Sequence, residues 1–123
     1  MAIPILKLGD YLIASIQSAL TDADLMGLQD DLARQVGELR SRGVVVDVTA
    51  AEVMDSFTIR TLLDMAHISK LRGAETVIVG LKPEVAFAMV QLGLRLDGVA
   101  TALDLEEGLS ILDGHMRGRA DAG

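Results

Sequence analysis

The stretch GVVVDVTAAEVMDSFTIRTLLDMAHISKLRGAETVIVG, residues 43–80, decides the fold class of this 123-residue chain. A β-branched run at residues 44–48 opens it and a second run at 76–80 closes it, and such runs are typical of strands buried on both faces of a sheet. Between them, residues 56–72 repeat apolar side chains at helical spacing and stop at Gly73. This strand–helix–strand unit predicts two parallel strands joined by a right-handed crossover.

The flanking segments add further strands and helices. Residues 3–8 and 11–16 read as a pair of strands joined by a tight turn. The remaining expected elements are a helix after the cap-like Thr21, a short helix from Pro83, a last strand within residues 98–102 and a final helix after Asp104. Helices packed on a mixed sheet follow from this alternation. We therefore expect one α/β domain over residues 1–113 and a flexible polar tail at 114–123.

Composition and charge exclude several classes of function. The formal net charge of −7 argues against nucleic acid and against an anionic membrane surface as partners. The chain has no cysteine and only two histidines, His67 and His115, so we expect no metal site and no cofactor. We expect no signal peptide, and the sequence contains no apolar run of about 18–20 residues. We expect a soluble, cytoplasmic protein.

Ser56 lies where the first buried strand has ended and the helix begins, the edge at which functional residues collect in open α/β sheets. The residues alone leave three interpretations: a helix-capping serine, a catalytic nucleophile, or an acceptor for a modifying enzyme. A nucleophile needs a base within reach, whereas His67 lies further along the same helix, about 16 Å away at helical rise. No nucleotide-binding fingerprint occurs either. The sequence therefore disfavours an enzyme.

The helix that follows Ser56 carries apolar side chains on two sides. The stripe that we expect to face the sheet consists of Ile59, Leu62, Leu63 and Ala66. A second stripe, on nearly the opposite side, consists of Phe57, Thr61, Asp64, Ile68 and Leu71. Either a neighbouring helix covers this second stripe or it forms a protein-binding surface. The helix at residues 83–92 is apolar on every side, which again indicates burial or a partner.

Several stretches together resemble the STAS domain of anti-sigma-factor antagonists. The resemblance rests on VVVDVTAAEVMDS (44–56), GAETVIVGLKPEVAFAMVQLGL (73–94), VATALDLEEGLSIL (99–112) and IPILKLGDYLIASIQ (3–17). Sporulation-type antagonists usually continue D-S-S-G at the motif, whereas this chain has Phe57 and Thr58 after Asp-Ser. The chain therefore looks more like the stressosome scaffold members of the family, which consist of the single domain.

The resemblance implies a STAS fold and a non-enzymatic role in stress-response signal transduction. By it, the protein binds and sequesters a serine/threonine switch kinase and releases that kinase when Ser56 is phosphorylated. The implied partners are a sensor-bearing STAS paralogue, which joins the chain in homo- and hetero-oligomers, and a PP2C-like phosphatase that resets the switch. The alternatives are a sporulation-type antagonist that binds an anti-sigma kinase and a stand-alone regulatory STAS domain.

The charge around Ser56 gives such a switch a physical basis. A phosphate adds about −1.5 to −2 charge beside Asp55 and near Glu52, while a helix N-terminus tolerates an anion. Arg60, one turn further on, is placed to pair with the phosphate. We therefore expect partner binding at Glu52, Asp55, Phe57 and Arg60. The sequence leaves open whether Thr58 or Thr61 is also modified.

Overall fold

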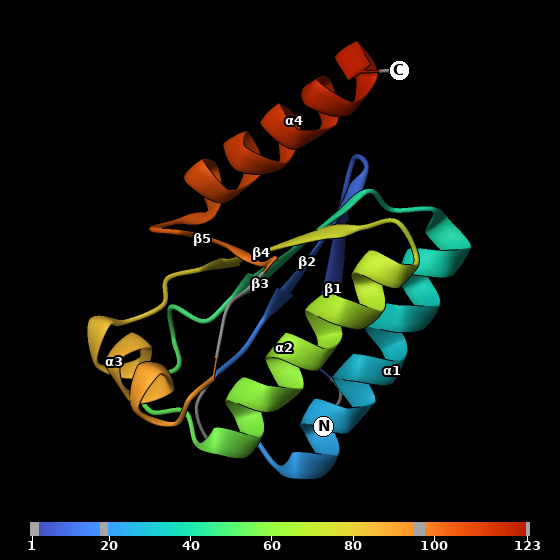
Figure 1. The fold of residues 1–123 in the computed structure, drawn as a ribbon. Helices are drawn as coiled ribbons and strands as arrows, with labels where there is room; N and C mark the ends of the chain where they lie inside the picture. Colours follow the sequence, from blue (N-terminus) through green and yellow to red (C-terminus); the bar gives the residue numbers. More distant parts are fainter. Residues whose placement is uncertain (1–2, 18–19, 95–97, 123) are drawn as a thin grey trace.

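The protein is built on a five-stranded mixed sheet (Figure 1). The computed structural model describes residues 3–17, 20–94 and 98–122. The strands lie in chain order: β1 (Ile5–Leu8), β2 (Tyr11–Ser15), β3 (Gly43–Asp47), β4 (Glu75–Val79) and β5 (Ala100–Ala102). β1 pairs with β2 in antiparallel fashion, and every other pair of neighbours is parallel. Both the expected hairpin and the expected parallel pairing across residues 43–80 are confirmed.

Four helices cover the sheet unequally. They are α1 (Asp22–Leu39), α2 (Ser56–Leu71), α3 (Pro83–Gln91) and α4 (Leu105–Ala122). α1 and α2 lie side by side on one face, and α4 crosses the other face over β3, β4 and β5 (Figure 1). α3 follows β4 and contributes Val85 and Met89 to the core beneath α1 and α2. The fold is therefore a sheet between a thick helical layer and a single helix.

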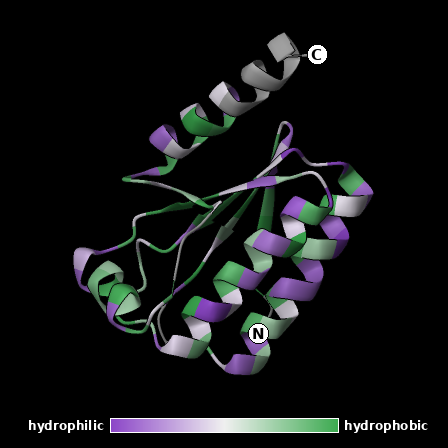
Figure 2. Cartoon of the chain, viewed as in Figure 1, coloured by the Kyte–Doolittle hydropathy of each residue, from purple (hydrophilic) through white to green (hydrophobic). Residues whose placement is uncertain are grey.

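Strand alternation builds two hydrophobic cores. Val44, Val46 and Ile78 point into the core under α1 and α2, whereas Val45 and Val77 point toward α4. Hydrophobic residues accordingly run along the central strands, while hydrophilic residues are interspersed along α1 and α2 (Figure 2). The expected burial of β3 and β4 on both faces is confirmed, which explains why these strands lack the alternation of a half-exposed strand.

The ends of the helices follow local sequence. Thr21 and Asp24 form a reciprocal capping box at the start of α1. The Asp104 carboxylate accepts a hydrogen bond from the Glu107 amide at 2.9 Å, as expected for the start of α4. α4 then continues through Ala122, so most of the segment expected to be a tail is helical. Its flexibility stays a prediction, and Gly123 lies outside the described residues.

Candidate functional site

The loop between β3 and α2 holds Ser56 at the carboxyl edge of the sheet. It leaves the sheet after the Val48 amide donates to the carbonyl of Val79, at 2.9 Å. The Asp47 carboxylate then accepts a hydrogen bond from the Thr49 amide at 2.9 Å, and the Ala51 amide closes a turn onto the Val48 carbonyl. Short-range hydrogen bonds therefore shape the first residues of the loop as soon as the strand ends.

Asp55, and not Ser56, caps α2. Its backbone is extended, and its carboxylate accepts a hydrogen bond from the Thr58 amide at 2.8 Å. That amide, and secondarily the Thr58 hydroxyl, hold the pKa of Asp55 below its usual range, so the carboxylate is ionised at neutral pH. The interpretation of Ser56 as the capping serine is wrong, because the helix begins one residue earlier than that role requires. Ser56 is the first helical residue and is exposed.

The other hydroxyls of this turn are less accessible than that of Ser56. Thr61 is only 4% exposed, and its hydroxyl donates to the Phe57 carbonyl at 2.8 Å. Thr58 is partly buried, and its amide is bound to Asp55. Among the three hydroxyls of this first turn and a half, that of Ser56 is therefore the best placed for a modifying enzyme.

The residues expected to bind a partner lie on the surface around Ser56. Glu52 and Arg60 are exposed, and Phe57, at the start of α2, is 38% exposed. On the same helix the first stripe is buried as expected, whereas the second is divided: Thr61 is covered and Leu71 is exposed. A neighbouring part of the fold therefore covers only part of the second stripe, and its role as a protein-binding surface stays a prediction.

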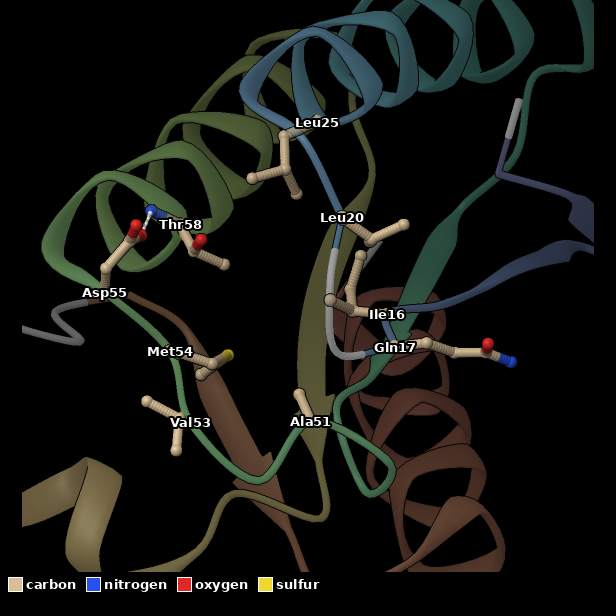
Figure 3. Close-up of a pocket in the computed structure, with 9 residues that line it drawn as sticks. All are labelled: Ile16, Gln17, Leu20, Leu25, Ala51, Val53, Met54, Asp55 and Thr58. Carbon is tan, nitrogen blue, oxygen red and sulfur yellow. Dashed lines mark hydrogen bonds between the residues drawn. The ribbon is translucent and has the colours of Figure 1, made fainter. Parts of the chain in front are cut away.

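A pocket of about 210 Å³ opens next to this turn (Figure 3). Three segments line it: the end of β2 and the connection after it, the first turn of α1, and the loop that enters α2. Six of its nine lining residues are apolar, and the Asp55 carboxylate and Thr58 lie at one side. The lining residues are Ile16, Gln17, Leu20, Leu25, Ala51, Val53, Met54, Asp55 and Thr58. Sequence reasoning did not find this pocket, because its walls come from segments far apart in the chain.

Exposed apolar side chains occur on the loop and on α3. Val53 in the loop is 83% exposed, although the sequence pattern assigned it no role. On α3, Phe87 and Val90 are 65% and 75% exposed, while Val85 and Met89 are buried. The helix that is apolar on every side is thus buried on one side and open to a partner on the other.

The surroundings of Ser56 offer little that would support hydrolytic chemistry. His67 is an exposed residue further along α2, and helical rise separates it from Ser56 by about 16 Å. Within residues 3–17, 20–94 and 98–122, no group of three or more histidine, cysteine or acidic side chains is arranged to hold a metal ion. The arrangement is that of an accessible hydroxyl on a surface with both apolar and acidic neighbours.

This fold and this loop define a class of protein. The family model of the STAS domain matches residues 2–107. The chain therefore belongs to the STAS-domain family, and the resemblance seen in the sequence is confirmed.

Two solved structures and one curated relative are similar to the chain along much of its length. A serine-to-glutamate variant of RsbS from Moorella thermoacetica has a TM-score of 0.84 and 35% identity, covering 94% of this chain and 97% of that one. A chain from the molecular architecture of the stressosome, a signal integration and transduction hub, has a TM-score of 0.82 and 37% identity, covering 93% and 99%. The RsbT co-antagonist protein RsbRA of Bacillus subtilis (strain 168) is 29% identical over 82 residues, 67% of this chain and 30% of that protein.

The match to the curated relatives is confined to one part of them. This chain spans about 30% of the length of RsbRA, so the likeness concerns only that part of the relative. In the part of the chain that the structure describes, no helix is both long enough and apolar enough to cross a membrane.

Proposed function

We propose that this protein is a non-enzymatic scaffold subunit of a stressosome-type signalling complex, which binds a serine/threonine kinase and releases it when Ser56 is phosphorylated. The observation that carries the proposal is the position of Ser56 as the exposed first residue of α2, with the cap supplied by Asp55. A kinase can reach such a hydroxyl. Phosphorylation of the hydroxyl leaves intact the capping hydrogen bond of the helix, which Asp55 makes. Identities of 35% and 37% to stressosome proteins support the assignment.

The release step is electrostatic. A phosphate on Ser56 adds about −1.5 to −2 charge next to the ionised Asp55 and near the exposed Glu52. The free amides and the positive end of the α2 dipole accommodate this charge, so the domain stays folded. Arg60, one turn along the helix, is placed to pair with the phosphate. A partner surface fitted to the neutral hydroxyl instead meets a strongly hydrated anionic group.

The proposed complex supplies the remaining partners. A sensor-bearing STAS paralogue fits the likeness to RsbRA, whose length is more than three times the matched region. The exposed Phe87 and Val90 of α3 and the exposed Phe57 of α2 are surfaces on which homo- or hetero-oligomers can form. A PP2C-like phosphatase removes the phosphate and resets the switch.

The test is phosphorylation followed by binding. With ATP and a stressosome-type kinase, the intact mass should rise by one phosphate in wild type and in the control Ser110→Ala, which alters an exposed helical serine on α4. Ser56→Ala should remain unmodified. Ser56→Asp should bind the kinase about 30- to 100-fold more weakly, equivalent to about 2–3 kcal/mol. Its circular dichroism should match that of wild type.

Two outcomes would contradict the proposal. One is a phosphate that maps to Thr58 or Thr61 while Ser56 stays unmodified. The other is kinase binding by Ser56→Asp that is as tight as that of wild type. A sporulation-type antagonist remains the second candidate, and preferential binding of an anti-sigma kinase over a stressosome-type kinase would favour it.

A further inference from the structure

Lys82 connects α3 to the loop that precedes Ser56. It is the last residue before α3 and is half-buried. Its ammonium Nζ donates to the carbonyl oxygen of Thr49 at 2.6 Å and lies 3.4 Å from that of Ala51. These carbonyls are more than thirty residues away in the chain, so Lys82 joins the segment after β4 to the segment after β3.

The two carbonyls lie where the loop has left the sheet. The last ladder-like bond of this strand is made by the Val48 amide, and the next regular structure begins at Ser56. A charged donor that binds two carbonyls restricts both peptide planes at once, and bonds of this kind are stronger than neutral ones. Lys82 therefore fixes the loop at residues 49–51, shortly after the end of β3.

A close approach at Gly80 reinforces this connection. A Cβ atom on Gly80 would lie 2.9 Å from Thr49 Cα, which shows how tightly the two segments approach. Beyond Ala51 the chain continues directly through Val53 and Met54, which line the pocket, to the Asp55 cap. A movement of Thr49 and Ala51 would therefore also move the turn that carries Ser56, which follows only a few residues later.

We propose that Lys82 is a positioning residue for phosphorylation of Ser56. Its ammonium holds the loop in the shape that presents the hydroxyl to the kinase, and its removal leaves the domain folded but lets the loop move. The kinase step of this proposal rests on the proposed function. The restraint that Lys82 places on residues 49–51, which we call the tether, can be measured without any kinase. Misplacing a reacting group by about 1 Å can cost on the order of 100-fold in rate.

The experiment compares Lys82→Met with Lys7→Met, which removes the same charge from the exposed β1 strand. Amide hydrogen exchange at residues 50–54 should accelerate in Lys82→Met and stay unchanged in Lys7→Met, with α1 and β3 equally protected in both. With the kinase that modifies wild type, kcat/KM for Ser56 should fall at least about tenfold in Lys82→Met alone. Lys82→Arg, which keeps a cationic donor, should restore both readouts.

Each outcome separates the two claims. If amide hydrogen exchange at residues 50–54 is as slow in Lys82→Met as in wild type, the tether is overturned. If exchange is faster but kcat/KM for Ser56 is unchanged, the positioning role is overturned. If Lys82→Arg loses either readout, a cationic donor at this position is not sufficient to hold the loop. That result would also overturn the proposal. If the kinase does not modify wild type at Ser56, the proposed function fails, while the exchange data still decide whether Lys82 holds the loop.

Discussion

Replacing Gly80 with alanine should destabilise the protein through two additive effects at one position. Gly80 has a φ of +78°, in the left-handed region, where an L-residue costs roughly 1–2 kcal/mol. The added Cβ would also clash with Thr49 Oγ1 and lie 2.9 Å from Thr49 Cα. Rotation of the threonine side chain relieves only the clash with the hydroxyl, so the backbone must shift, and overpacking of this kind typically costs about 1–3 kcal/mol.

The expected total for Gly80→Ala is about 2–5 kcal/mol of unfolding free energy. Urea titration followed by circular dichroism measures it, and the m-value should stay constant if only stability changes. Gly73→Ala is the matched control, because its φ is +90° and nothing lies within 4 Å of the added Cβ. That variant should lose only the conformational part, about 1–2 kcal/mol.

A third variant separates the clash from the backbone strain. In the Gly80→Ala background, Thr49→Ala removes the clash with the hydroxyl but leaves the backbone of residue 49 in place, so it should recover part of the lost stability. The reasoning is refuted if Gly80→Ala is no more destabilised than Gly73→Ala. It is also refuted if Thr49→Ala recovers nothing, because the loop would then not be held against Gly80 as the structure shows.

The remaining predictions concern the cap, assembly and catalysis. Because the pKa of Asp55 is lowered in the folded state, the stability due to its charge is present above the unfolded pKa of about 3.9 and is lost as pH falls through the folded pKa. The difference in Tm between wild type and Asp55→Asn should therefore change below about pH 4, and a difference independent of pH would exclude this role of the charge. Phe87→Ser combined with Val90→Ser should reduce self-association or assembly with a STAS paralogue in light scattering while leaving Tm nearly unchanged, because both side chains are exposed; unaltered assembly would show that α3 is not the interface. The purified protein should not hydrolyse ester or phosphoester substrates, and turnover that disappears in Ser56→Ala would contradict the non-enzymatic assignment.

The sequence by itself was sufficient for the architecture of the central unit. The β-branched runs at 44–48 and 76–80 and the helical spacing between them are local signals, and each reports burial along its own segment. The right-handed crossover rule then leaves the parallel arrangement of β3 and β4 as the natural choice. The position of Asp55 and Ser56 at the end of a strand and the start of a helix was evident for the same reason.

Tertiary structure decided which of the two residues caps the helix. Aspartate and serine are both good capping residues, so composition does not distinguish them. The choice depends on the residue at which the loop backbone turns from extended to helical, and this point is set by how the loop is held after β3. Asp55 takes the cap, and Ser56 is left exposed as the first helical residue.

The contacts that hold this loop could not be predicted from the sequence. Lys82 binds the carbonyls of Thr49 and Ala51, Gly80 makes room for Thr49, and three separate segments enclose the pocket beside Asp55. Periodicity and capping rules describe a residue's neighbours along the chain. Lys82 and Gly80 meet the loop because β3 and β4 are neighbours in the sheet, and the end of β2 meets it because β2 pairs with β3. The sequence therefore located the proposed switch residue, and the packing of parallel strands determined how that residue is presented.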